Sequence, residues 1–248
     1  MKILEIEHFS KSYDSDKKAV NDISLTVNSG EIYGFIGHNG AGKSTTIKAI
    51  VGILSVHEGD VKVCGKSVRT SLRECQQMTG YLPDNPDIYE FMTGIEYINF
   101  VCDIFSVPGE ERTARVKKYA DAFEITQNLG DLISSYSHGM KQKVALIAAF
   151  AHQPKLLVLD EPFVGLDPMA SATLKRCMRE LCEEGSAIFF STHVLDVAEK
   201  LCNKVAIIKS GELIASGRMD ELVKEGESLE DVFMEVLNGE SDTEHMQH

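Results

Sequence analysis

The stretch GHNGAGKST, residues 37–45, is the strongest indication of what this chain is. A glycine is followed by four residues and then by Gly-Lys-Ser, which is the spacing of a phosphate-binding loop. The apolar run 32–36 before it predicts a buried strand, and the residues after it have helical spacing. In such a loop the backbone N–H groups turn inward, and the following helix adds the positive end of its dipole. We therefore expect the chain to bind the phosphates of a nucleoside triphosphate.

Each residue type in this loop has a chemical reason. Glycine tolerates positive φ and lets the backbone approach phosphate oxygens closely. Lys43 is predicted to reach the β- and γ-phosphates and to act in catalysis, and the Ser44 hydroxyl is predicted to bind Mg²⁺. The predicted nucleotide contacts in the loop are Gly37, His38, Asn39, Gly40, Ala41, Gly42, Lys43, Ser44 and Thr45.

A second motif is LLVLDE at 156–161, an apolar strand that ends in two acids. Strands of a parallel sheet end at one edge, where the phosphate-binding loop also lies. Asp160 is therefore predicted to bind Mg²⁺, and Glu161 to orient and deprotonate the attacking water, with ATP and Mg²⁺ as cofactors. The alternative is a strand that simply ends in exposed acids, and the phosphate-binding loop makes this the weaker interpretation.

The composition is that of a globular protein, with 43% hydrophobic and 25% charged residues. The net charge of −13 argues against a nucleic-acid partner, because surfaces that bind nucleic acids are basic. The longest apolar run, 144–151, is too short to cross a bilayer, and the first residues lack the pattern of a signal peptide. Six cysteines without a CxxC pair predict reduced core residues rather than a metal site. We expect a cytoplasmic protein that reaches a membrane only through a partner.

Hydrophobic periodicity divides the chain into three regions. The first 65 residues alternate as strands do, and 91–130 have helical spacing, with Thr93 and Glu96 placed as a capping box. Strand and helix patterns then alternate, which predicts a mostly parallel sheet covered on both faces. The predicted strands are 32–36, 156–160, 187–193 and 204–209, and the helices between the last three are 169–183 and 194–202.

The C-terminal region predicts three smaller features. A turn at Ser210 and Gly211 joins the strand 204–209 to LIASG as a hairpin. Ser228 and Asp231 are placed to cap a short last helix. The final ten residues are polar and are expected to be disordered.

Four motifs in one order resemble the ATP-binding subunits of ABC transporters. After the phosphate-binding loop come YSHGMKQK at 136–143, LLVLDEPFVGLDP at 156–168 and STH at 191–193. The resemblance covers residues 1–220. It implies an ATPase that dimerises, as a homodimer, around two ATP molecules and drives a separate integral membrane permease from the inner face of the cell membrane.

The resemblance also implies an α/β fold with three parts. These are a P-loop NTPase core with a mostly parallel sheet flanked by helices, an N-terminal antiparallel β subdomain, and an inserted α-helical subdomain. The single domain then spans 1–220, with the core and β subdomain in 1–85 and 151–220 and the helical subdomain at about 86–150. A short helix and an acidic flexible tail follow at 221–248.

Two residues match the family's adenine pocket. Tyr13 lies where an aromatic ring stacks on adenine, and Val20 borders the same pocket. Taken alone, a tyrosine in SKSYDSD is more simply a strand-end residue.

Four residues match positions that contact the γ-phosphate or the second subunit. Ser137 and Gly139 match the signature motif, which contacts a nucleotide held by the other subunit, and they open a helix whose N-terminus attracts anions. Asp167 matches the loop that crosses the dimer interface. His193 matches the switch histidine, a catalytic residue that donates to the γ-phosphate, whereas a lone histidine after a strand is usually structural.

The sequence departs from the family pattern in two places. The usual signature is Leu-Ser-Gly-Gly-Gln, and here Tyr136, His138 and Met140 replace three of those residues. In GYLPDNP, Asp84 stands where a glutamine normally contacts Mg²⁺ and water. Aspartate is shorter, charged and acceptor-only. We predict that Asp84 binds Mg²⁺ directly or through water.

Features that are less specific than these motifs favour an exporter. Asp84, the helical insertion, GYLPDN, FMTG and the C-terminal SLEDVFMEV are similar to ATPases of bacterial drug-resistance and bacteriocin-immunity exporters. The predicted docking surface for the membrane subunit is a groove near 84–91. The alternatives are a soluble ABC ATPase that moves no substrate and a small-molecule kinase. Soluble ABC ATPases usually carry a second ATPase half, a coiled-coil insertion or zinc-binding cysteines, and this sequence shows none of them. A small-molecule kinase would not explain YSHGMKQK.

Overall fold

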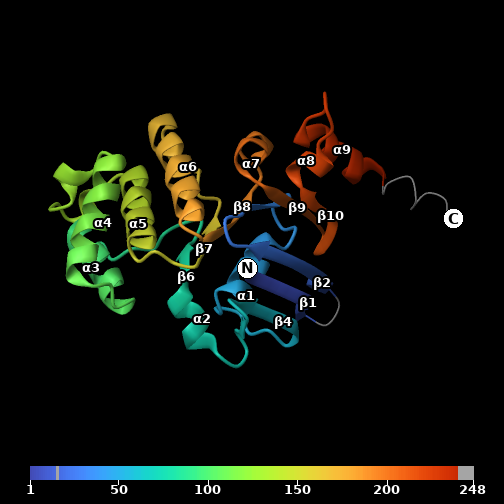
Figure 1. The fold of residues 1–248 in the computed structure, drawn as a ribbon, viewed down its shortest axis with the longest axis horizontal. Coiled ribbons are helices and arrows are strands. Elements are labelled where there is room, and N and C mark those ends of the chain that lie inside the picture. Colours follow the sequence, from blue (N-terminus) through green and yellow to red (C-terminus); the bar gives the residue numbers. More distant parts are fainter. Residues whose placement is uncertain (15–16, 240–248) are drawn as a thin grey trace.

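Two sheets and a set of helices make up the computed structural model, which describes residues 1–14 and 17–239 (Figure 1). The first sheet is antiparallel, in the order β2-β1-β4-β5. In the second, β9, β3, β8, β7 and β6 run parallel in that order, and β10 pairs antiparallel with β9 at the edge. The strands are β1 (Lys2–Asp14), β2 (Lys17–Asn28), β3 (Ile32–Ile36), β4 (Glu58–Val63), β5 (Lys66–Ser67), β6 (Thr79–Leu82), β7 (Leu156–Asp160), β8 (Ala187–Thr192), β9 (Lys204–Lys209) and β10 (Glu212–Arg218).

The helices lie on both sides of the parallel sheet and at one end of the molecule (Figure 1). Two short 3₁₀ turns, Thr126–Asn128 and Ile133–Ser135, lie between α4 and α5. The α-helices are α1 (Lys43–Ile50), α2 (Leu72–Met78), α3 (Gly94–Ile104), α4 (Gly109–Ala122), α5 (His138–Ala151), α6 (Pro168–Glu183), α7 (Leu195–Leu201), α8 (Met219–Leu222) and α9 (Leu229–Gly239).

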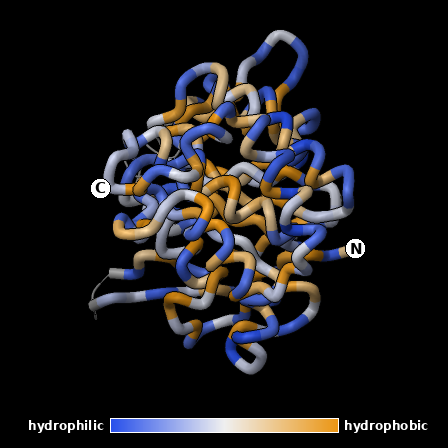
Figure 2. The backbone as a smooth tube through the Cα atoms, turned by 90° about the vertical axis from the view of Figure 1, so that its left-hand side faces the viewer, coloured by the Kyte–Doolittle hydropathy of each residue, from blue (hydrophilic) through white to orange (hydrophobic). Residues whose placement is uncertain are grey.

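The parallel sheet separates two hydrophobic cores. Every residue of β7 is buried, and successive side chains of a strand point to opposite faces. Leu157 and Leu159 accordingly pack into the core under the helices, whereas Leu156 and Val158 pack into the core shared with the antiparallel sheet. The same arrangement explains why LLVLD has no polar alternation. Figure 2 shows hydrophobic segments in the interior and hydrophilic ones at the periphery.

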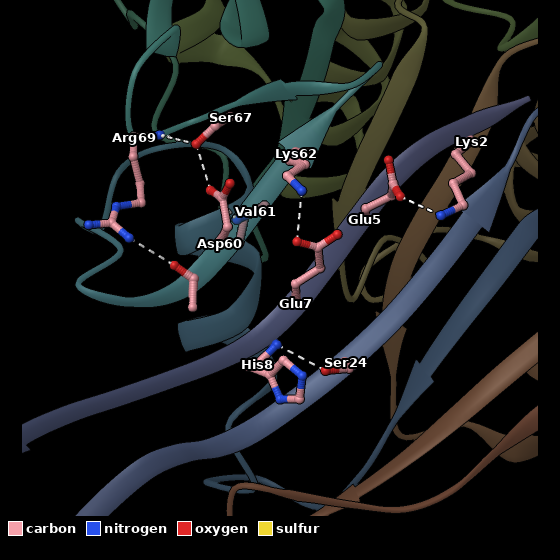
Figure 3. A network of polar contacts seen from close by, with 11 residues as sticks. Lys2, Glu5, Glu7, His8, Ser24, Asp60, Val61, Lys62, Ser67 and Arg69 are labelled. Carbon is pink, nitrogen blue, oxygen red and sulfur yellow. Dashed lines mark hydrogen bonds and ion pairs between the residues drawn. The ribbon is translucent and has the colours of Figure 1, made fainter.

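The antiparallel sheet is held mainly by its buried face. Its outer face carries exposed ion pairs such as Lys62 with Glu7 (2.7 Å) and Lys2 with Glu5 (2.6 Å), shown in Figure 3. Exposed pairs of this kind contribute little to stability. The register of β1 shifts near His8, whose φ is 50° and whose N–H donates to Ser24 Oγ, as expected at a bulge (Figure 3).

The helices α3, α4 and α5 pack on one another at the end of the molecule away from β1 and β2 (Figure 1). The predicted capping box at the start of α3 is confirmed, because Thr93 Oγ1 accepts from the Glu96 N–H and the Glu96 carboxylate accepts from the Thr93 N–H. These helices bury Ile98, Val116 and Phe150 in one shared core.

The C-terminal predictions are confirmed where the structure describes them. β9 and β10 form the expected hairpin. Ser228 Oγ accepts from the Asp231 N–H, and the Asp231 carboxylate accepts from the Ser228 N–H, so this pair caps α9. The final ten residues are expected to be disordered, and nine of them, 240–248, lie outside the described residues.

Among the elements that were not expected from the sequence are α2 and β6. They bring the segment after β6, which contains Asp84, to the edge of the parallel sheet beside β7. The predicted fold class is confirmed: a mostly parallel α/β core with an antiparallel N-terminal sheet and an inserted group of helices. Among residues 1–14 and 17–239, no helix is both long enough and apolar enough to cross a membrane.

Candidate functional site

The phosphate-binding loop connects the carboxyl end of β3 to α1. Gly42 is the residue before α1 and has the left-handed φ of 113°. A Cβ at this position would lie 2.7 Å from the Ala19 carbonyl oxygen, so only glycine fits without strain. The loop is further held by hydrogen bonds from Thr46 N–H to the Gly42 carbonyl (3.0 Å) and from Gly211 N–H to the Ala41 carbonyl (2.9 Å).

Replacing Gly42 by Ala is expected to lower the free energy of unfolding by about 1–3 kcal/mol, because the new Cβ combines a positive φ with a backbone clash. Urea denaturation followed by circular dichroism measures this. Gly130→Ala is the matched control, since a Cβ there meets nothing within 4 Å and the φ is ordinary. A Gly42 variant as stable as the Gly130 variant would contradict the strained geometry.

Lys43 is the first residue of α1, and its side chain turns back into the loop. Its Nζ donates to the carbonyl oxygens of Gly37 (2.5 Å) and His38 (3.3 Å), and its side chain is only 6% exposed. The same ammonium lies 3.6 Å from Glu161 Oε1. The loop carbonyls thus satisfy a buried cation that would exchange them for phosphate oxygens.

Glu161 directly follows β7 and carries a positive φ of 48°. Its N–H donates to Ser191 Oγ (3.1 Å), and its Oε2 lies 3.0 Å from His193 Nδ1. Its Oε1 is buried and has no hydrogen-bond partner. A buried carboxylate oxygen without a donor is unusual, and a bound water or ligand group would satisfy it.

Asp160, the last residue of β7, is 5% exposed and accepts a hydrogen bond from Ser191 Oγ (2.5 Å). Ser191 therefore binds both acids at this strand end. It was not among the predicted site residues. Ser191 lies opposite Asp160 in the pairing of β7 with β8. The register of these two parallel strands is the feature from which Ser191 could have been predicted as a site residue.

The predicted phosphate and metal residues line one cavity of about 210 Å³. Asp84, in the segment after β6, also lines this cavity, although it lies far along the chain from the phosphate-binding loop. Gly37 and Ala41 are the two predicted loop residues outside the lining set. The cavity is lined by Ala19, His38, Asn39, Gly40, Gly42, Lys43, Ser44, Thr45, Asp84, Asp160 and Glu161.

The charge around this cavity is predominantly negative. Of the residues that the structure describes, three carboxylates and one ammonium line it. Burial raises the pKa of the neighbouring Tyr81 hydroxyl to about 12, and the negative charges of Asp160 and Asp84 act in the same direction. A strongly negative triphosphate therefore requires further positive charge, which a divalent cation would supply.

The described residues contain no group of three or more His, Cys, Asp or Glu side chains able to hold a metal ion by themselves. The donors that line the cavity nevertheless fit Mg²⁺. This ion prefers one or two carboxylates or hydroxyls together with waters and substrate phosphates. Ser44 and Asp160 supply such oxygens, and Asp84 adds a third.

The two residues predicted for adenine lie in different environments. Tyr13 is 60% exposed, and its hydroxyl lies 3.3 Å from Thr45 Oγ1. Val20 is fully buried and packs beneath the loop, 3.3 Å from the position of a Cβ on Gly42. Stacking by Tyr13 and a contact of Val20 with adenine stay predictions.

The signature residues lie apart from this cavity. Ser137 is the N-cap of α5 and accepts from the Met140 N–H (3.3 Å), and Asp167 is the N-cap of α6 and accepts from the Ala170 N–H (2.8 Å). The bond to Ala170 N–H, aided by Lys143, lowers the pKa of the Asp167 carboxyl. Ser137, Gly139 and Asp167 are absent from the residues that line the cavity of their own chain.

Two of the three residues that depart from the usual signature, Tyr136 and His138, have structural contacts. The His138 ring covers Gly165, where a Cβ would lie 2.6 Å from His138 Cδ2, so the signature packs against the segment that carries Asp167. The Tyr136 hydroxyl donates to the Asn128 carbonyl oxygen (2.5 Å). The departures from the family pattern therefore fix the start of α5 to its surroundings.

Comparison with known proteins agrees with this geometry. One family model, described as ABC transporter, matches residues 20–164, which is more than half of the chain. The ABC-type transporter ATP-binding protein EcsA of Bacillus subtilis is 32% identical over 240 residues, which are 95% of this chain and 97% of that protein. The uncharacterized ABC transporter ATP-binding protein YthP of the same organism is 34% identical over 242 residues, 96% of this chain and 98% of that protein.

Solved structures give the same result. One described as the structure of an ATP binding subunit of an ABC transporter superposes with a TM-score of 0.91 at 32% identity, covering 95% of this chain and 99% of the other. The cbiO1 protein of Clostridium perfringens, described as part of the ABC transporter complex cbiONQ, has a TM-score of 0.76 at 26% identity. That match covers 89% of this chain and 90% of cbiO1.

Proposed function

The chain belongs to the ABC transporter family and is an ATP-binding ATPase subunit of it, and on this premise we propose that two copies enclose ATP and drive export through a separate membrane subunit. The observation that carries the site assignment is the convergence of Lys43, Ser44, Asp84, Asp160 and Glu161 on one cavity beside the phosphate-binding loop. No single segment of the chain contains all five residues.

The nucleotide phosphates occupy the loop in this proposal. The N–H groups of residues 37–45 and the N-terminus of α1 surround the β- and γ-phosphates, and Lys43 leaves the loop carbonyls to bind them. The exposed ring of Tyr13 stacks on the adenine, with Val20 bordering the pocket from below.

The lining of the cavity would hold Mg²⁺. Ser44, Asp160 and Asp84 would bind the ion, Asp160 and Asp84 directly or through water. When bound, the ion neutralises the charge that develops on the phosphate oxygens. Asp160 is kept in position by Ser191.

Glu161 is the general base in this proposal. Its Oε1, which has no hydrogen-bond donor of its own, accepts the hydrogen bond of the attacking water and takes its proton. His193, 3.0 Å from Oε2, orients the carboxylate and donates to the γ-phosphate. The 3.6 Å contact with Lys43 holds Glu161 in place before the nucleotide arrives.

A second copy of the chain supplies the remaining contacts. Ser137 and Gly139 lie at the N-terminus of α5, outside the cavity of their own chain, so they are available to a γ-phosphate held by the partner copy. Asp167, at the N-terminus of α6, also lies outside the cavity of its own chain and is available to the partner copy. A head-to-tail pair then buries two ATP molecules between opposed helix ends.

The division of the chain into parts is proposed on the same basis. The core and β subdomain comprise 1–85 and 151–220, and the helical subdomain comprises about 86–150. Residues 221–248 form the C-terminal addition, which includes the end of α8 and the whole of α9.

The membrane subunit docks, we propose, into a groove between the core and the helical subdomain. A cavity of about 530 Å³ lies there, bounded by α2, β6, α3 and α5. Tyr89 and Phe91 beside it are 47% and 77% exposed and are in ring contact with each other. Exposed apolar surface of this kind marks a protein interface. The description of cbiO1 as part of a larger complex supports a partner of this class.

The exporter assignment rests on the family resemblance of the segment around Asp84 and of α9, and the chain then works at the cytoplasmic face of the membrane.

A soluble ABC ATPase without a transport role is the competing function. The two are separated by recovering the tagged chain from native membranes in a gentle detergent and identifying its partners by mass spectrometry. A polytopic membrane protein at near-equal amount supports the proposal, and recovery of soluble partners alone would contradict it.

Ile104→Asp is expected to reduce the recovered membrane protein by about tenfold or more, because it places an unpaired charge in the groove. Ile104 is 51% exposed, so the variant should fold, which its thermal unfolding checks. Met234→Asp is the matched control, since Met234 is 50% exposed on α9 and outside the groove. Equal recovery with the two variants would place the docking surface elsewhere.

A further inference from the structure

The C-terminal helix α9 contacts the phosphate-binding loop directly. The Phe233 ring lies 5.2 Å from the His38 ring, at an interplanar angle of 63°, which is an edge-to-face arrangement. Phe233 is 7% exposed and belongs to the core beneath the helices, whereas His38 is exposed. The two residues come from opposite ends of the chain, so their contact depends on where α9 packs.

Several interactions fix α9 in this position. Leu229 is fully buried, and its N–H donates to Glu199 Oε2 on α7 (2.8 Å). The Ser228–Asp231 pair caps the helix. α7 begins at Leu195, directly after the loop that carries His193. α9 therefore contacts both the phosphate-binding loop, through Phe233 and His38, and α7, the helix that follows His193.

His38 has two backbone functions in the loop. Its carbonyl oxygen accepts from Lys43 Nζ (3.3 Å) and from the Ala41 N–H (3.1 Å). Its side chain has the Phe233 ring as an aromatic neighbour. The orientation of this peptide thus affects both the resting place of the Lys43 ammonium and the turn that surrounds the phosphates.

We propose that Phe233 is a positioning residue that holds His38, and with it the phosphate-binding loop, in the conformation that binds ATP. The C-terminal helix then sets the nucleotide affinity of a site whose other residues lie far from it in sequence. This inference rests on the proposal that the loop holds the ATP phosphates.

The simpler alternative is that Phe233 only fills the core. Phe233→Leu separates the two roles, because leucine keeps most of the buried apolar volume but loses the ring that contacts His38. Phe233→Met is a second variant in case the branched side chain does not fit, since methionine fills irregular gaps. His38→Ala removes the other half of the contact at an exposed position.

The test is a double-mutant cycle on nucleotide affinity, with the wild type, Phe233→Leu, His38→Ala and the double variant. The dissociation constant is measured by titrating the full chain with a fluorescent ATP analogue and Mg²⁺. Phe233→Leu is expected to weaken binding by about two- to tenfold, as for loss of one aromatic contact. In the His38→Ala background the same change is expected to have no further effect. Wild-type affinity of Phe233→Leu, or effects that multiply in the double variant, would overturn the proposal.

Two controls make the result specific. Met234→Leu, on the exposed side of α9, should bind like the wild type, and thermal unfolding of each variant reports its folding. Lys43→Ala tests the underlying site. If Lys43→Ala binds normally, the proposed phosphate site is wrong. If it loses binding while Phe233→Leu does not, only the role of Phe233 is wrong.

Discussion

Glu161→Gln is expected to lower kcat for ATP hydrolysis by about 10²- to 10⁴-fold while ATP still binds. Glutamine keeps the size and shape of the side chain but cannot take a proton from water. The hydrogen bond from the Glu161 N–H to Ser191 Oγ uses only the backbone of residue 161 and remains, so the strand end keeps its geometry. The loss therefore falls on the chemical step and not on the binding of the nucleotide.

Phosphate release and nucleotide affinity, measured on the same preparation, separate these two steps. Glu183→Gln is the matched control, because Glu183 is exposed at the end of α6 and its loss of charge should change neither quantity. If Glu161→Gln turned over ATP within about tenfold of the wild type, general-base catalysis by this residue would be refuted.

Lys43→Ala is expected to weaken ATP binding by about 10- to 100-fold, the range for losing charge-assisted hydrogen bonds to phosphate. Among the described residues that line the cavity, Lys43 supplies the one ammonium beside three carboxylates. Without it, the loop N–H groups and the α1 dipole alone would have to offset the phosphate charge. Glu161, which is 12% exposed and lies 3.6 Å from Nζ, would also lose its neighbouring cation.

Lys48→Ala on the same helix is the control for a general loss of positive charge. Lys48 is exposed in the last turn of α1, so its removal should leave the affinity nearly unchanged. Equilibrium titration with ATP and Mg²⁺ measures both variants. Equal affinity for the Lys43 and Lys48 variants would mean that Lys43 does not contact the phosphates.

Much of the central fold can be predicted from the sequence, because buried parallel strands are continuous apolar runs. The strands at 32–36, 156–160 and 204–209 have the predicted bounds. β6 and α2 could not be predicted in this way. β6 has four residues, too few to establish a period, and α2 buries only Cys75, so it has no apolar stripe.

The candidate site shows a similar division. The phosphate-binding loop and the acids after β7 are local motifs, and a sequence pattern is sufficient to find them. Ser191 depends on strand register, which requires the pairing of β7 with β8. The contact of Phe233 with His38 depends on the packing of α9 and leaves no local pattern at either residue. Long-range contacts of this kind follow from the whole fold, whereas motifs follow from the chemistry of a few neighbouring residues.

Sedimentation velocity of the Glu161→Gln variant, with and without ATP and Mg²⁺, tests the central claim most directly. If two copies enclose ATP, the variant binds the nucleotide, hydrolyses it only slowly, and should shift from monomer to dimer only when both ATP and Mg²⁺ are present. The dimer should fail to form with Lys43→Ala added. A Glu161→Gln protein that stays monomeric in saturating ATP and Mg²⁺, although titration shows ATP bound, would contradict the account.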